Sequence, residues 1–94
     1  MKRDVRLTAK AENDLQRLQD FLADKNPDAS LRAAAAITDA VLSLAEHAER
    51  GFMGPAANLR QIAVPFGDSG YIIQYRVQAL SIIVARIKHA RERR

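Results

Sequence analysis

The sequence predicts an α+β fold in which a short strand and a helical hairpin precede three further strands. Three observations support this prediction. A short alternating segment opens the chain, two long segments with helical periodicity follow, and β-branched and aromatic residues dominate from residue 59 onward. A chain of 94 residues with 48% hydrophobic content can bury one core, so we expect a single domain over residues 1–94.

The first strand should cover residues 4–7, where polar and apolar side chains alternate. Thr8 is a good N-cap for a helix over residues 9–24. Four apolar residues of this helix are spaced to form one stripe: Ala11, Leu15, Leu18 and Leu22. Three charged residues are expected to point away from that stripe: Asp14, Arg17 and Asp20.

The second helix should follow the break around Pro27, with Asp28 as its cap, and cover residues 29–50. Its apolar side comprises Leu31, Ala34, Ile37, Val41, Leu44 and Ala48. Gly51 is a natural helix terminator. Because the link between the helices is short, they should form an antiparallel hairpin.

Three strand segments complete the chain. Residues 59–64 are β-compatible, and residues 65–70 have the composition of a loop. Residues 71–77 are rich in aromatic and β-branched side chains, and residues 81–87 form a second apolar run of strand length. The expected order is therefore β-α-α-β-β-β, with the helical hairpin packed on a small antiparallel sheet.

The composition narrows the possible chemistry. The chain has no Cys, which excludes disulfides, thiolate metal sites and a cysteine nucleophile. No His, Asp and Glu residues have metal-ligand spacing, so we expect neither a metal nor a cofactor. The start lacks the apolar region of a signal peptide, and no apolar run reaches the roughly 20 residues of a membrane span. We therefore expect a cytoplasmic protein without membrane contact.

The positive charge is concentrated at the end of the chain. Residues 1–75 hold 9 Lys/Arg and 10 Asp/Glu, a net charge of −1. Residues 76–94 hold 6 Lys/Arg and a single acid, a net charge of +5. Such a block is typical of a contact surface for nucleic acid or for an acidic protein segment, or of a solvated basic tail.

Four segments resemble motifs of the ParE/RelE toxin superfamily. Residues 5–15 (VRLTAKAENDL) are similar to its opening strand and helix, and residues 59–62 (LRQI) to its "LR" strand. Residues 70–77 (GYIIQYRV) are similar to its "GYxxxYRV" strand, and residues 83–92 (IVARIKHARE) to its closing segment. Each motif is short, but together they cover nearly the whole chain in the family's order.

The resemblance implies the toxin of a type II toxin–antitoxin system. It also implies a ParD-like antitoxin whose C-terminal segment folds on the toxin, along the helical hairpin and toward the basic end. The residues that this implies for antitoxin binding are Leu15, Leu18, Leu22, Ile37, Val41 and Arg86.

The superfamily contains two activities. RelE-like members cleave mRNA in the ribosomal A site, and ParE-like members act on DNA gyrase and block replication. A ribonuclease needs an acid, a base and cations around the phosphate. In the RelE-like pattern an Arg follows the Tyr of the "GY" strand and a Tyr lies near the C-terminus. Here Ile72 follows Tyr71, and no aromatic residue follows Ile87. This favours a ParE-like toxin that inhibits gyrase by binding and performs no chemistry itself.

Two alternatives remain. A RelE-like endonuclease acting on ribosome-bound mRNA could use Arg60, Arg86, His89 and Arg91 for acid–base chemistry and phosphate binding. The chain could also be a non-toxic interaction module. Under the gyrase hypothesis, the expected target contacts are Arg60, Arg76, Arg86, Lys88, His89 and Arg91. Tyr71 and Tyr75 are interpreted as core residues.

Overall fold

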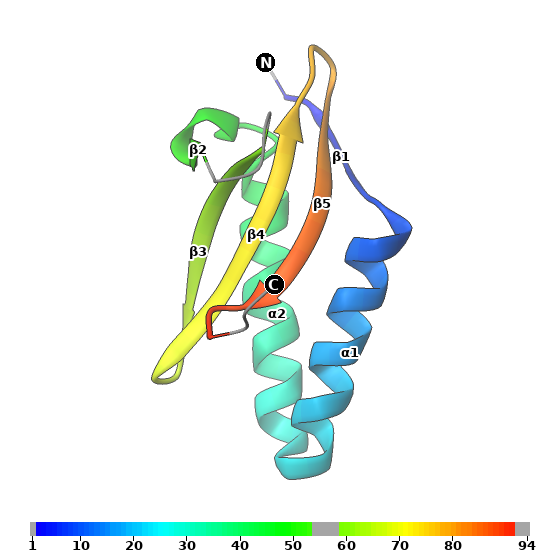
Figure 1. Ribbon diagram of the computed structural model, residues 1–94, viewed down its shortest axis with the longest axis vertical. Coiled ribbons are helices and arrows are strands. Elements are labelled where there is room, and N and C mark those ends of the chain that lie inside the picture. Colours follow the sequence, from blue (N-terminus) through cyan, green and yellow to red (C-terminus); the bar gives the residue numbers. More distant parts are fainter. Residues whose placement is uncertain (1, 54–58, 92–94) are drawn as a thin grey trace.

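The computed structural model describes residues 2–53 and 59–91. Its helices and strands follow the predicted order, with a short 3-10 helix and a two-residue strand added after the second helix (Figure 1). The elements are β1 (Asp4–Leu7), α1 (Ala9–Lys25), α2 (Pro27–Ser43), η1 (Ala48–Arg50), β2 (Phe52–Met53), β3 (Arg60–Phe66), β4 (Ser69–Val77) and β5 (Ser81–His89). The predicted α+β fold class is confirmed.

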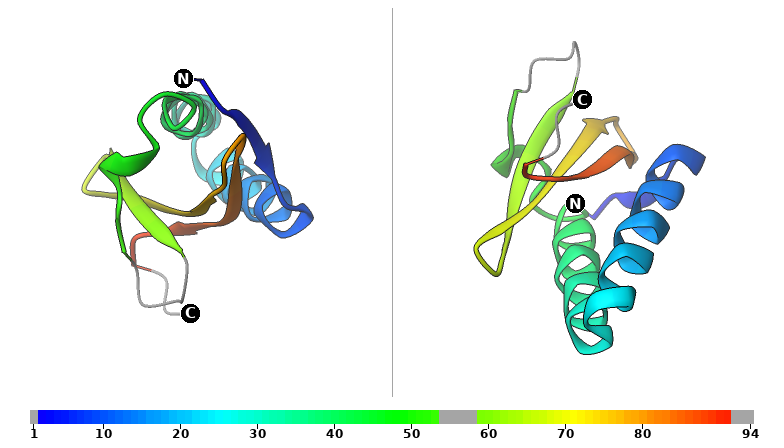
Figure 2. Two further views of the ribbon diagram at one scale, coloured as in Figure 1. Left: turned by 90° about the horizontal axis from the view of Figure 1, so that it is seen from above. Right: turned by 60° about the horizontal axis from the view of Figure 1, so that its bottom comes forward.

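The strands form one sheet in the order β1-β5-β4-β3-β2. The expected antiparallel meander is β3-β4-β5. The sequence did not predict a partner for β1, which joins β5 in parallel, with Leu7 opposite Val84. Both helices cover the same face of the sheet (Figure 2). The first strand of the chain therefore lies beside the last one.

The helix starts depend on side-chain caps. Thr8 is confirmed as the cap of α1, because its Oγ1 accepts a 3.0 Å hydrogen bond from the Ala11 amide. Asp28 is not the cap of α2. Asn26 takes that role and accepts from the Ala29 amide at 3.1 Å. Pro27 then occupies the first helical position, where its missing N–H costs nothing and its fixed φ suits the helix.

The second helix is shorter than predicted. It ends at Ser43, seven residues before Arg50, and Gly51 is extended with φ −76° rather than left-handed. Buried contacts explain this end. The Tyr75 hydroxyl donates to the Ala48 carbonyl at 2.6 Å and accepts from the Gly51 amide at 3.1 Å. These bonds satisfy backbone groups that a continued helix would have paired internally, so tertiary structure overrides local helix propensity.

The predicted loop at residues 65–70 is mostly strand. The two-residue turn at Gly67 and Asp68 lies between β3 and β4, and Gly67 has a positive φ of 59°. Pro65 lies within β3, where it pairs with Gly70 on one side only. On the other side of β3, within the described residues, β2 pairs only with Arg60 and Gln61. Proline is tolerated there because an edge strand does not need the missing N–H.

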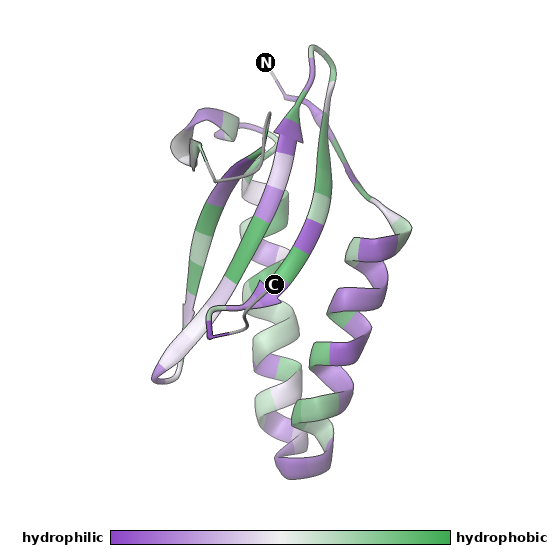
Figure 3. Cartoon of the chain, viewed as in Figure 1, coloured by the Kyte–Doolittle hydropathy of each residue, from purple (hydrophilic) through white to green (hydrophobic). Residues whose placement is uncertain are grey.

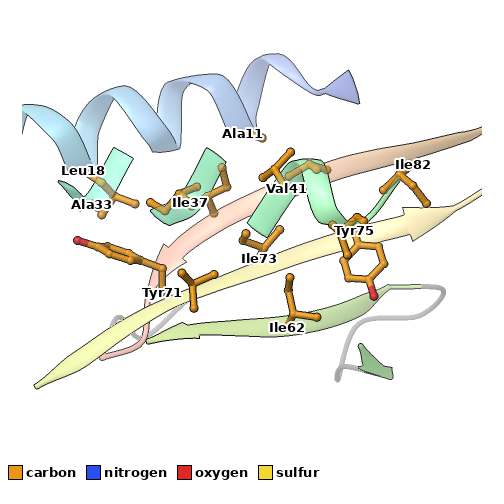
Figure 4. Close-up of a cluster of buried hydrophobic side chains, with 14 of the residues drawn as sticks. Ala11, Leu18, Ala33, Ile37, Val41, Ile62, Tyr71, Ile73, Tyr75 and Ile82 are labelled. Carbon is orange, nitrogen blue, oxygen red and sulfur yellow. The ribbon is translucent and has the colours of Figure 1, made fainter. Parts of the chain in front are cut away.

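The core lies between the helical hairpin and the sheet. Colouring by hydropathy shows α1 as mostly hydrophilic with a minority of apolar residues, as expected for a helix with one buried face (Figure 3). Leu18, Ile37 and Val41 of the helices meet Tyr71 and Ile73 of β4 (Figure 4). Tyr71 and Tyr75 are 3% and 0% exposed, so their interpretation as core residues is confirmed.

Candidate functional site

A buried carboxylate links α1 to the end of β5. Asp14 accepts hydrogen bonds from Arg86 Nε at 2.8 Å, from Arg86 Nη2 at 3.2 Å and from the Ile87 amide at 2.9 Å. A weaker ion pair joins it to Arg17 at 3.6 Å. The prediction that Asp14 points away from the core is wrong, since its side chain is only 7% exposed.

The spacing of Asp14 could have revealed this burial. It follows Ala11 by three residues and precedes Leu18 by four, which places it within the apolar stripe. An acid at such a position needs partners. Burial raises the pKa of Asp14, but hydrogen bonds from Arg86 and the Ile87 amide, with the charges of Arg86 and Arg17, bring it below the ordinary value of 3.8. The carboxylate is therefore stabilised in its charged form.

The predicted nuclease residues do not form one cluster. Arg60 lies opposite Tyr75, whereas His89 lies opposite Tyr71. Four residues of an extended strand span roughly 14 Å. Arg60 donates to the Gly51 carbonyl at 2.8 Å, and Arg86 is bound to Asp14. The strand register therefore separates residues that the sequence had grouped.

Two of the predicted target residues lie on the sheet face opposite the helices. Arg76 follows the buried Tyr75 and is exposed. Lys88 follows the buried Ile87 and is half-buried. Arg6 on β1 adds a third cation to this face, because its neighbours in the strand pack against the core and its own side chain is 71% exposed. We call Arg6, Arg76 and Lys88 the outer-face cations.

Arg6 and Arg76 lie close together although they are 70 residues apart. Both are aligned with Ile83, Arg6 from β1 and Arg76 from β4. Two strand spacings separate them, or roughly 10 Å. No sequence pattern pointed to Arg6, because the partner of β1 could not be predicted.

Two of the remaining predicted residues, His89 and Arg91, line a groove on the other side of the sheet. The groove has a volume of about 600 Å³ and a mostly apolar lining. From α1 it is lined by Arg17, Leu18, Phe21 and Leu22. From the β3–β4 hairpin it is lined by Phe66, Asp68, Ser69 and Tyr71, and from the end of β5 by His89 and Arg91. An apolar groove with charged residues at its rim suits an amphipathic protein segment.

His89 forms part of the groove wall. Its ring meets Tyr71 edge to face, with 5.6 Å between the ring centroids. The Arg91 amide donates to His89 Nδ1 at 3.2 Å. Burial raises the pKa of Tyr71. The Ala90 amide donates to the Gly70 carbonyl at 2.9 Å and closes this end of the sheet.

The apolar residues predicted to bind antitoxin lie mostly inside the fold. Ile37 and Val41 are 1% and 7% exposed and belong to the core, and Leu15 is partly buried against it. Leu18 and Leu22 also line the groove. Sequence reasoning missed Phe66, because it placed that residue in a loop. Phe21, at the edge of the predicted stripe, is 61% exposed and lies at the groove.

Two further features concern the described residues only. No group of three or more His, Asp or Glu side chains among residues 2–53 and 59–91 is arranged to hold a metal ion. No helix in these ranges has the length and apolar character needed to cross a bilayer. Residues 92–94, which contribute to the basic block, lie outside the described residues.

The chain is similar to known toxins along nearly its full length. Toxin RelE3 of Caulobacter vibrioides is 37% identical over 92 residues, which cover 98% of this chain and 99% of that protein. Toxin RelE1 of the same organism is 37% identical over 91 residues, which cover 96% of each.

Two solved structures share the fold. A chain of the chromosomal ParDE toxin–antitoxin system from P. aeruginosa matches with a TM-score of 0.83 and 22% identity, over 95% of this chain and 97% of that one. A chain of the RelBE2 toxin–antitoxin complex from Mycobacterium tuberculosis matches with a TM-score of 0.66 and 21% identity, over 95% and 99%. The family model for the ParE toxin of the type II toxin–antitoxin system parDE matches residues 5–94. The chain therefore belongs to the ParE toxin family of type II toxin–antitoxin systems, within the ParE/RelE superfamily.

Proposed function

We propose that this toxin blocks replication by binding DNA gyrase and has no nuclease activity of its own. The observation that carries the proposal is the separation of Arg60 from His89, two of the four residues that an RNA-cleaving site could use. His89 and Arg60 are roughly 14 Å apart along the sheet, too far to act on one phosphate. A toxin without a convergent acid–base site has to act through its surface.

The contacts of the candidate catalytic side chains within the protein support the same conclusion. The Arg60 guanidinium binds backbone carbonyls near η1, and the Arg86 guanidinium binds a buried carboxylate. Freeing Arg86 for a substrate phosphate would leave Asp14 buried without its main partner, which is costly. Tyr71, with its raised pKa, is a poor proton carrier at neutral pH. Arg60, Arg86 and Tyr71 therefore have structural roles.

The outer-face cations are the best candidates for contacts with the target. Arg6, Arg76 and Lys88 project from neighbouring strands of a rigid sheet, on the face that the helices leave uncovered. Arg6 has an acidic neighbour, Asp4, at 3.9 Å. A rigid surface with excess positive charge suits an anionic face of gyrase or its bound DNA.

The groove is the proposed site for the cognate antitoxin. The two solved structures that share the fold come from a ParDE toxin–antitoxin system and a RelBE2 toxin–antitoxin complex, which supports such a partner here. An amphipathic antitoxin segment would place apolar residues against Phe21, Phe66 and Tyr71. Acidic residues beside them would face Arg17 and Arg91 at the rim. Toxin activity would then be restrained by a segment that folds on binding.

A second candidate function is RelE-like cleavage of mRNA on the ribosome. The names of the relatives, Toxin RelE3 and Toxin RelE1, favour it. In that case His89 and Arg91, which are joined by a hydrogen bond at the groove rim, would be the residues nearest to the chemistry.

Induction of the toxin without its antitoxin separates the two functions. Inhibition of gyrase predicts double-strand breaks and filamentation while translation continues, and purified toxin should stabilise gyrase cleavage complexes on supercoiled DNA. Ribosome-dependent cleavage predicts prompt arrest of translation, with cuts in mRNA at the A site. The second result would overturn the proposal, and absence of both would indicate a non-toxic interaction module.

Charge-removal variants locate the target contacts. A variant with Arg6, Arg76 and Lys88 replaced by Ala should lose toxicity but keep antitoxin affinity within about threefold, because rim and exposed cations contribute little to a remote site. The matched control replaces three exposed cations of the helices, Lys10, Lys25 and Arg32, and should remain toxic. Equal toxicity of both variants would place the target surface elsewhere.

A further inference from the structure

The edge of β5 is covered by β1 over only part of its length. Pairing with β1 ends where Leu7 lies opposite Val84. Thr8 continues this cover, because its amide donates to the Val84 carbonyl at 3.0 Å and its hydroxyl to the Ala85 carbonyl at 3.1 Å. The pairing of β4 with β5 then shifts its register between Gln74 and Tyr75 of β4, which pair with Arg86 and Val84 of β5. Beyond that irregularity β5 has no strand partner on this side among the described residues.

Beyond this point Asp14 provides a hydrogen-bond acceptor for the edge of β5. Its carboxylate accepts a 2.9 Å hydrogen bond from the Ile87 amide, which would otherwise be a buried N–H without a strand partner. The two bonds from Arg86 hold the residue immediately before it. An edge next to a bulge is a place where strand pairing frays, since the ladder is already disrupted there. One side chain of α1 therefore holds the last segment of β5.

That segment carries one wall of the groove. His89 is two residues beyond Ile87, on the same face of the strand, and its ring rests against Tyr71. Arg91 follows, with its amide bonded to the His89 ring. Asp14 and Arg86 do not line the groove themselves. Movement of β5 away from α1 at Ile87 would change the position of both wall residues.

We propose that Asp14, acting with Arg86, is a positioning residue that fixes the groove wall for the binding partner. It does so from outside the groove, by holding Ile87 and so aligning His89 and Arg91 against Tyr71 and Phe21. The assignment of a partner rests on the proposed function, in which the groove receives the antitoxin. Under this proposal Arg86 works inside the protein, although the sequence suggested it as a contact for target or antitoxin.

Hydrogen exchange of individual amides tests the positioning directly. Asp14→Asn keeps the shape and an acceptor for Ile87 but removes the charge that binds Arg86. Amides 87–91 should exchange at least about tenfold faster in this variant, as expected from the loss of one charge-assisted hydrogen bond. Amides 82–84, which β1 pairs, should be unchanged. Asp20→Asn, on the exposed side of the same helix, is the matched control.

Antitoxin affinity tests the consequence for function. Asp14→Asn should weaken binding of the cognate antitoxin about tenfold, and Asp14→Ala should weaken it further, with most of the effect in the dissociation rate. Phe21→Ala, which alters the groove directly, reports whether the groove is the docking site. The proposal is overturned if Phe21→Ala weakens binding and Asp14→Asn does not.

Hydrogen exchange distinguishes the positioning role of Asp14 from the proposal that the groove binds the antitoxin. If neither variant affects affinity, the groove is not the antitoxin site, and exchange at amides 87–91 alone decides the role of Asp14. Faster exchange confined to these amides supports the positioning role. Unchanged exchange overturns it, as does an equal increase across both helices and all strands, because Asp14 would then serve only global stability.

Discussion

The hydroxyl of Tyr75 is bonded to the carbonyl of Ala48 at 2.6 Å, across 27 residues of sequence. This contact and the bond from the Gly51 amide hold η1 against the C-terminal part of β4. Tyr75→Phe should therefore leave two buried backbone groups without their partner and destabilise the fold by about 1–3 kcal/mol. For a chain of this size, each kcal/mol lowers Tm by about 4–8 °C in calorimetry.

An unchanged Tm in Tyr75→Phe would show that these backbone groups are satisfied in another way. Tyr71→Phe is a suitable comparison, because Tyr71 is also buried in β4 but lies at the opposite end of the core.

The Asp14–Arg86 pair predicts a loss of stability in acid. The pKa of Asp14 is lower in the folded chain than its ordinary value of 3.8, so the unfolded state binds a proton first as the pH falls. The contribution of this group is complete above the unfolded pKa and disappears as the pH falls through the folded pKa. Denaturant unfolding from about pH 5 to about pH 2 measures it.

Asp14→Asn isolates this contribution, because the variant cannot titrate at position 14. The gap in unfolding free energy between the wild-type chain and the variant should be widest near neutral pH and should narrow on acidification. A constant gap over the same range would mean that the carboxylate has no depressed pKa in the folded state.

Leu18 and Leu31 provide a matched pair for the packing of the helical hairpin. Leu18 is 7% exposed, whereas Leu31, which was wrongly predicted to lie on the apolar side of the second helix, is 71% exposed. Leu18→Asp places an unpaired charge in the core and should unfold the chain or abolish its antitoxin complex. Leu31→Asp should change the unfolding free energy by no more than about 0.5 kcal/mol. Far-ultraviolet circular dichroism and denaturant titration distinguish the two, and a folded Leu18→Asp variant would contradict this packing.

Local patterns predicted the elements whose ends depend on local chemistry. Thr8 was recognisable as a cap because its role needs only the next three residues. The end of α2 was not predictable in the same way, since it depends on Tyr75, which lies 32 residues beyond Ser43. The parallel partner of β1 likewise follows from contacts between the two ends of the chain.

In the candidate site, too, some features were predictable from local sequence and others depended on tertiary structure. Sequence reasoning found the cations near the C-terminus but did not assign those of β5 to faces. Lys88 and His89 are adjacent in sequence, yet Lys88 lies on the outer face and His89 at the groove. The bulge before Arg86 shifts the alternation, so a simple count of residues along β5 does not give the facing of its second half. Only the register with β4 resolves it.

The turn between β3 and β4 offers a final test, in which two glycines with positive φ should respond differently. Gly67 has φ 59° and no heavy atom within 4 Å of an added Cβ. Gly67→Ala should therefore cost only the left-handed backbone penalty of about 1–2 kcal/mol, and Gly67→Asn less, because Asn tolerates that conformation. Gly70 has φ 139°, and its Cβ would lie 2.3 Å from the Val64 carbonyl oxygen.

Gly70→Ala should consequently be the more damaging change, with strain and a backbone clash that cost at least about 2–3 kcal/mol. It should also weaken antitoxin binding, because the Gly70 carbonyl accepts the Ala90 amide at the groove wall between His89 and Arg91. Gly67→Ala serves as the control for affinity, since Gly67 lies in the same β3–β4 hairpin without that bond. Equal stability of the two variants would contradict the close approach of β3 to Gly70.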